Sequence, residues 1–302
     1  MAKTVSLEQF SHFLADLPYA SQSPRQVLDL IYPEESSEAP PLVVFIHGGG
    51  WIHGAKREDT VKSIFKIVSQ GYAVATVEYR FSDEALWPAQ LFDVKAAIRF
   101  LRAHASEYGY SVDPLVVWGN SAGAALCQFL AATPDDPAME DRTMGNVDVS
   151  SRVDGLISWY GISDMFTMDQ QCEWIFHGEH LIDTASEQSH CSLVLGQSVE
   201  KDQKLTMRAS AVSYVTEDFP PALFQHGTRD RVVPHFQSVE MVNRITQCCG
   251  TERAILELFE GADHGDPVIK SDENIRRCLR FLDEIYGRVP RTIGELPEII
   301  LA

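Results

Sequence analysis

The stretch at residues 115–131 constrains the fold of this chain more than any other. It opens with a short apolar run rich in β-branched residues, which predicts a strand, and closes with an alanine-rich run, which predicts a helix. Between them lies G-x-S-x-G at 119–123. A strand that turns into a helix within one residue needs small neighbours, and it lifts Ser121 above the sheet edge with the Ala122 N–H beside it. The alternative is a glycine–serine turn that only caps a helix.

Strands and amphipathic helices alternate along most of the chain. The patterns predict strands at 26–32, 42–46, 72–77, 115–119, 153–159, 221–225 and 254–259, and helices at 59–70, 88–108, 236–248 and 272–286. This alternation indicates an α/β fold, a three-layer, doubly wound and mostly parallel sheet, in a single domain over 1–302. The apolar end of the tail, 287–302, is expected to dock on that domain.

Two segments fall outside the alternation. Within residues 1–25, a capping box at 6–9 predicts a short N-terminal helix with one apolar face, formed by Leu7, Phe10, Leu14 and Leu17. Residues 162–210 are polar and offer only short helical runs, so we expect a cap-like insertion over the active site.

A second motif, His-Gly-Gly-Gly-Trp at 47–51, follows the predicted strand 42–46. Consecutive glycines leave the backbone bare, so that their N–H groups can point at a ligand. The tetrahedral intermediate of acyl transfer needs such donors because it carries a negative charge on the former carbonyl oxygen. A flexible glycine turn is the alternative interpretation.

A serine hydroxyl needs a base to remove its proton, and a carboxylate to orient that base. Asp230 and His264 each follow a predicted strand by five residues, and with Ser121 they occur in the order Ser, Asp, His. Because strand C-termini meet at one edge of a doubly wound sheet, we expect the three side chains to come together. Asp263 is the rival for the acid, and a surface loop histidine is the alternative for His264.

The composition of the chain limits the classes of partner that we expect. The formal net charge of −18 argues against nucleic acid and anionic membranes as partners. No stretch approaches the roughly 20 apolar residues of a membrane span, and the first residues do not form a signal peptide. The six cysteines show no C-x-x-C spacing, so we expect reduced thiols and a cytoplasmic protein, with a Cys172–Cys191 bridge as the alternative.

Aromatic residues near the expected strand ends and in the insertion are candidates for substrate contact. They are Trp51, Trp87, Trp159, Tyr160 and Trp174. For Trp159 a place in the core is equally compatible with the pattern. A metal site built from His177, His180 and His190 is a weak alternative, and we expect neither a metal nor another cofactor.

Jointly, the motifs at 47–51, 119–123, 226–230 and 261–265 resemble those of α/β-hydrolases of the hormone-sensitive-lipase-like group. With the run from 79 to 102, they are more similar to the branch that contains feruloyl and acetyl-xylan esterases. The resemblance covers about 40–285. Asn120 stands where the lipase-like group usually has aspartate, and Ala124 where the esterase branch often has a second glycine.

This resemblance implies a serine carboxylic ester hydrolase that acts through an acyl-enzyme on small-molecule esters with small acyl groups, such as acetyl or aryl esters. Ser121 would be the nucleophile, His264 the base and Asp230 its orienting acid. The oxyanion hole would be formed by the amides of Gly49, Gly50 and Ala122. An amidase similar to kynurenine formamidase is the first alternative, and a non-catalytic receptor on this fold is the second. A homodimer is possible on this interpretation.

Overall fold

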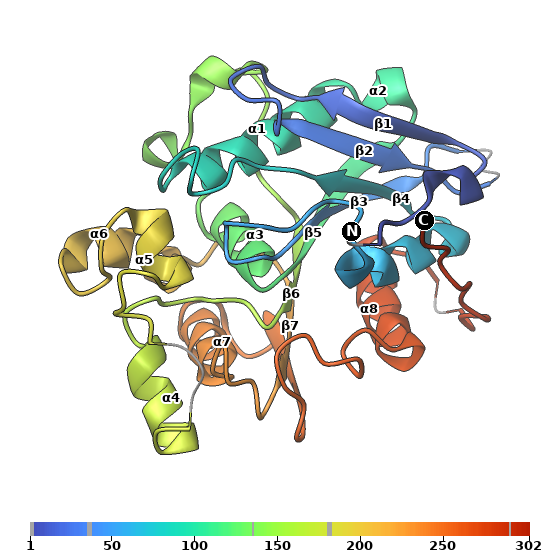
Figure 1. Ribbon diagram of the computed structural model, residues 1–302. Coiled ribbons are helices and arrows are strands. Elements are labelled where there is room, and N and C mark those ends of the chain that lie inside the picture. The colour runs from blue at the N-terminus through green and yellow to red at the C-terminus, as the bar shows by residue number, and fades with distance from the viewer. Residues whose placement is uncertain (1–2, 35–37, 135, 180–182, 290) are drawn as a thin grey trace.

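The parallel strands that the sequence predicts lie side by side in one sheet. The structure is a computed structural model that describes residues 3–34, 38–134, 136–179, 183–289 and 291–302. Within these residues the sheet has eight strands in the order β1-β2-β4-β3-β5-β6-β7-β8 (Figure 1). β2 pairs antiparallel with both β1 and β4, and every other pair is parallel. The mostly parallel α/β sheet is therefore confirmed, with an antiparallel edge.

Seven of the eight strands lie within a few residues of predicted bounds, and β1 was not predicted. The strands are β1 (Phe13–Pro18), β2 (Val27–Ile31), β3 (Pro41–Ile46), β4 (Ala73–Val77), β5 (Ser111–Asn120), β6 (Gly155–Trp159), β7 (Ala222–Gly227) and β8 (Ala254–Phe259).

Helices cover both faces of the sheet (Figure 1). One face carries α1 (Ala89–Ala103), α3 (Ala122–Ala132) and α7 (Phe236–Cys249), and the other carries the 3₁₀ segment η2 (Asp59–Gln70) and α8 (Asp272–Ile285). Strand side chains alternate between the two cores, as the pleat requires. In β3, for example, Val44 packs in the first core and Val43 and Phe45 in the second. This alternation produces the three layers.

Shorter helical segments fill the connections. α2 (Ala105–Tyr108) follows α1, so the predicted helix over 88–108 is two helices. The long loop after α3 contains the 3₁₀ turns η3 (Pro137–Met139) and η4 (Arg142–Met144). The predicted insertion at 162–210 holds α4 (Met168–Phe176), α5 (His190–Leu195) and α6 (Gln203–Arg208), and η5 (Ala211–Tyr214) follows it.

The N-terminal helix predicted within residues 1–25 is wrong. In the described part of this segment, residues 3–25, the only helical element is a 3₁₀ turn, η1 (Leu7–Gln9), and the chain then enters the edge strand β1. The register of β1 against β2 shifts between Leu14 and Leu17. A bulge of this kind lets two residues three positions apart face the same side of a sheet, and both leucines pack against one core. The spacing that suggested a helix therefore belongs to a bulged strand.

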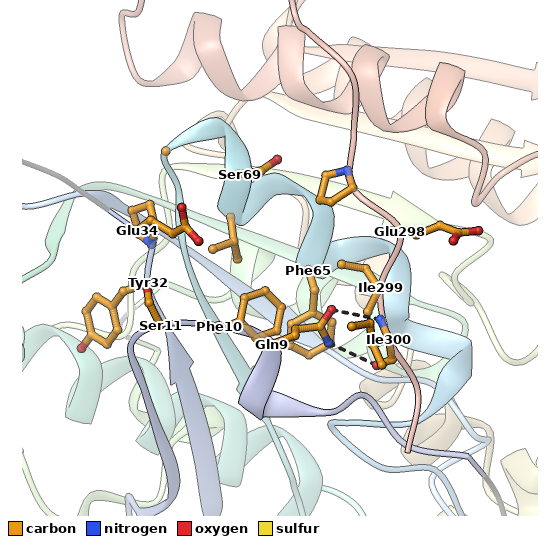
Figure 2. A pocket seen from close by; sticks show the side chains of 14 residues that line it. Gln9, Phe10, Ser11, Tyr32, Glu34, Phe65, Ser69, Glu298, Ile299 and Ile300 are labelled. Atoms are coloured by element: carbon orange, nitrogen blue, oxygen red, sulfur yellow. Dashed lines mark hydrogen bonds between the residues drawn. The ribbon is translucent and has the colours of Figure 1, made fainter.

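The C-terminal tail docks, as expected, beside the N-terminal segment. Val5 and Leu301 form a β-bridge, and the Gln9 side chain exchanges two hydrogen bonds with the Ile300 backbone (Figure 2). A cavity of ≈ 500 Å³ lies between this tail, η1 and η2. It shares no lining residue with the cavity at Ser121 described below.

Two further findings concern membrane-spanning helices and the cysteines. Among the described residues, no helix combines the length and apolar character needed to pass through a bilayer. All six cysteines are free, so Cys172 and Cys191 do not form a bridge.

Candidate active site

Ser121 occupies the sharp turn between β5 and α3 that the sequence predicts. Its φ of 52° and ψ of −124° are strained for a residue with a side chain. A Cβ on Gly119 would lie 2.6 Å from the Gly123 backbone, and one on Gly123 would lie 2.1 Å from the Ile46 carbonyl oxygen. Only glycine fits at both positions, because strand and helix touch there. The turn therefore holds Ser121 at the carboxyl edge of the sheet.

His264 and Asp230 reach Ser121 from the loops after β8 and β7. His264 Nε2 lies 3.0 Å from Ser121 Oγ, and His264 Nδ1 lies 2.7 Å from Asp230 Oδ2. The three side chains thus form one hydrogen-bonded chain. In this arrangement His264 can take the proton of Ser121 while its other nitrogen donates to the carboxylate.

The environment of Asp230 keeps its carboxylate ionised. The side chain is fully buried, and its second oxygen accepts hydrogen bonds from the backbone N–H groups of Val232 and Val233. Burial on its own would raise the pKa of Asp230. Hydrogen bonds from His226 and His264 and their charges outweigh it and hold the pKa well below the usual aspartate range. His226 lies 3.2 Å from the carboxylate and is itself bonded to Ser238.

Asp263 has a different role. Its carboxylate pairs with Arg231 at 2.7 Å and accepts a hydrogen bond from the backbone N–H of His264. It therefore braces the loop that carries His264, while the imidazole itself faces Asp230. Of the two acids that the sequence offers, Asp230 is the one whose carboxylate contacts the imidazole of His264.

The glycine loop after β3 lies directly beside Ser121. The Gly48 N–H donates to the Asn120 side chain at 2.9 Å, which ties the loop to the serine turn. Gly49 and Gly50 have φ of 112° and 60°, which favour glycine. A Cβ on Gly50 would lie 2.1 Å from the His190 ring, so the imidazole of α5 sits against this glycine. Gly49, Gly50 and Ala122, the first residue of α3, thus border the serine.

Ser121 and His264 open into one cavity of ≈ 340 Å³. Tyr160 and the glycine loop line it as predicted. It is also lined by residues that the sequence did not single out for this place: His53, Glu58, Thr60, His190 and Lys270. Lys270 lies only six positions after His264, and this short separation along the chain could have pointed to it as a residue near the site. His190 could not be placed from sequence, because its position depends on how the insertion docks.

The four candidate tryptophans do not line this cavity. Trp51 and Trp159 are buried in the two cores, at 1% exposure each, and Trp87 packs on Phe129. Trp174 is 60% exposed and lines a separate groove beside α7. Of the five aromatic candidates, only Tyr160 is brought to Ser121.

His190 and His177 of the insertion lie in different places. His190 lines the cavity, His177 ends α4 at the surface, and His180 lies outside the described residues. In the described part of the chain, no three His, Cys, Asp or Glu side chains come close enough to share one metal ion.

The chain matches a known protein family. The model of the family described as BD-FAE matches residues 28–245. The chain belongs to this family. The matched part includes Ser121 and Asp230 and ends before His264. The chain also shares the α/β-hydrolase fold of esterases, which confirms the resemblance drawn from its motifs.

Among curated proteins, this BD-FAE chain is similar to Esterase LipC of Mycobacterium tuberculosis, with 27% identity over 87% of this chain and 63% of the relative. The probable carboxylic ester hydrolase LipM of the same organism is 30% identical over 82% of this chain and 55% of the relative. The chain thus spans little more than half of the length of these relatives. A structure described as a truncated carbohydrate esterase from gut microbiota has a TM-score of 0.84 and 25% identity, covering 95% of this chain and 100% of that one.

Proposed function

We propose that this BD-FAE protein is a serine carboxylic ester hydrolase. The observation that carries the proposal is the continuous hydrogen-bonded chain from Ser121 through His264 to Asp230, at the wall of a cavity bordered by a glycine loop. The relatives named esterases support it.

In this reaction Ser121 Oγ attacks the ester carbonyl carbon while His264 Nε2 takes the hydroxyl proton. The carbonyl π-bond opens, and its electron pair moves to the oxygen. The amides of Gly49, Gly50 and Ala122 stabilise that oxyanion as backbone donors. The tetrahedral intermediate then expels the alcohol, which takes its proton from the imidazolium, and leaves an acyl group on Ser121.

Water completes the cycle by the same steps in reverse order. His264 takes a proton from the water as it attacks the acyl-enzyme, and returns it to Ser121 Oγ as the acid leaves. Asp230 stays ionised throughout: it fixes the imidazole with Nδ1 protonated and stabilises its charged form. Its low pKa suits this task.

The size of the cavity favours small substrates. Ligand pockets usually have volumes of about 300–1,000 Å³, and the cavity at Ser121 lies at the lower end of that range. We therefore propose esters with small acyl groups, such as acetyl or aryl esters. The cytoplasmic location, a homodimer and a capping role of residues 162–210 stay predictions.

The test is hydrolysis of 4-nitrophenyl acetate by the wild-type protein, with Ser121→Ala beside it and the exposed Ser69→Ala as a matched control. We expect Ser121→Ala to lower kcat by roughly 10⁴-fold or more, with Ser69→Ala unchanged. The matched anilide, 4-nitroacetanilide, should be a much poorer substrate. Faster cleavage of the anilide would make the protein an amidase, and near-wild-type turnover by a folded Ser121→Ala would overturn the serine mechanism.

A further inference from the structure

We infer that the substrate carries a carboxylate, which Lys270 binds inside the cavity that holds Ser121. The inference rests on the proposed ester hydrolysis and names its substrate class: small esters with an anionic group on either the acyl or the alcohol part.

The first observation is the position of the ammonium. Lys270 lies on the loop between His264 and α8 and lines the same cavity as Ser121. Its Nζ is 3.7 Å from the point that a Cβ on Gly265 would occupy, and the Tyr160 hydroxyl lies at the same distance from that point. Gly265 directly follows His264, so a cation and a buried hydroxyl flank the loop of the general base.

The second observation is that this ammonium contacts no carboxylate directly. Within the described residues, no carboxylate lies within ion-pairing distance of Lys270. Charged groups on neighbouring segments are engaged elsewhere: Lys62 pairs with Asp59, and Lys66 pairs with Asp272. Lysines that lose water contact without a partner are uncommon, because desolvation penalises the charged form. Burial accordingly lowers the pKa of Lys270. The charge of Asp59, which pairs directly with Lys62, opposes this shift from a distance, and the charge of Lys62 adds to it.

The fold gives no local reason for a cation here. Lys270 directly precedes the N-cap residue of α8, Ser271, whose side chain accepts from the Asn274 N–H. The positive end of the helix dipole disfavours a cation at this place. A half-buried lysine beside a helix N-terminus that lines a cavity and contacts no carboxylate is typical of a binding residue.

The other ionisable side chains that line the cavity are less suited than Lys270 to bind a carboxylate. Glu58 lines the cavity too, but its carboxylate accepts a hydrogen bond from Thr60 and does not pair with Lys270. Burial lowers the pKa of His190, and the charges of His53 and His264 lower it further, which favours the neutral ring. Lys270 is therefore the one lysine or arginine among the residues that line this cavity, and a carboxylate complements its ammonium.

The test uses two pairs of esters that differ only in charge. 4-Acetoxybenzoate and its methyl ester vary the alcohol part, and phenyl hydrogen adipate and phenyl methyl adipate vary the acyl part. For each pair the ratio of kcat/KM, charged over neutral, is measured by release of the phenol. We expect Lys270→Met to lower this ratio about 10- to 100-fold for at least one pair, as loss of a hydrogen bond between charged groups would.

Lys270→Arg, which keeps the charge, should retain most of the ratio. Lys201→Met, which removes an exposed lysine outside the cavity, should leave it unchanged. High salt should lower the ratio of the wild-type protein, which tests the attraction without any substitution. Equal ratios in wild type and Lys270→Met for both pairs would overturn the inference while neutral esters are still cleaved. A wild-type protein that cleaves no ester would overturn the proposed function itself.

Discussion

The loops at the carboxyl edge of the sheet and the insertion at 162–210 meet at one cavity but are built differently. The edge loops that carry Asp230 and His264 are tied to each other by backbone hydrogen bonds, such as Arg229 N–H to Ala262 at 2.9 Å. The insertion has short helices whose connections are held in part by side chains: Ser189 Oγ donates to Thr184 O, and Asp169 accepts from the Thr184 N–H. Main-chain pairing to a rigid sheet fixes reacting groups more tightly than side-chain contacts do. We therefore assign the chemistry to the edge loops, and we expect the insertion to add to substrate binding through His190.

The largest effect within this comparison should separate the two acids of the edge loops. Asp230→Asn should lower kcat about 10²-fold more than Asp263→Asn, because only Asp230 contacts the imidazole. Steady-state kinetics with 4-nitrophenyl acetate on both variants measures the difference. If Asp263→Asn were the more damaging change, the assignment of the orienting acid would be wrong.

A smaller effect should come from the insertion. His190 packs against Gly50 and lines the cavity, so His190→Ala should raise KM about 10-fold with a smaller change in kcat. The exposed His177→Ala, in the same insertion, is the matched control and should behave as wild type. If His190→Ala lowered kcat as much as Asp230→Asn, a residue of the insertion would take part in catalysis, and the assignment of catalysis to the edge loops alone would be wrong.

The smallest effect concerns folding at low pH. Because the folded-state pKa of Asp230 is depressed, its ionisation stabilises the fold above the unfolded-state pKa, about 3.9. That contribution is lost as pH falls through the folded-state value. Urea unfolding should therefore show a stability gap between wild type and Asp230→Asn that is full above about pH 5 and narrows below pH 4. A gap that widens on acidification would contradict the depressed pKa.

The same contrast explains what could be predicted from the sequence. The serine turn follows from local sterics, since Gly119 and Gly123 leave no room for a Cβ. Ser121, Asp230 and His264 were predictable because parallel strands end at one edge. Each of these residues is marked by its own local pattern, a strand followed by a short loop, and the parallel sheet brings the loops together.

The failures depend on longer-range packing. The β-bulge between Leu14 and Leu17 produces the spacing of a helix face. Only the pairing of this segment with β2 makes it a strand. Trp51 and Trp159 belong to motifs near the site, but the large apolar surface of each side chain favours burial in a core. His190 enters the cavity through contacts of α5 with a distant loop, including Trp87 N–H to Val194 O. Nothing in the local pattern signals such docking.

The central claim is that Ser121 forms the covalent acyl-enzyme, and covalent trapping tests it most directly. The wild-type protein is treated with a 4-nitrophenyl alkylphosphonate, which mimics the tetrahedral intermediate, and the labelled peptide is identified by mass spectrometry. We predict one phosphonyl group per chain, on the peptide that contains Ser121, with loss of activity in step with labelling and no labelling of Ser121→Ala. Stoichiometric label on another residue, or full inactivation without label on Ser121, would contradict the mechanism.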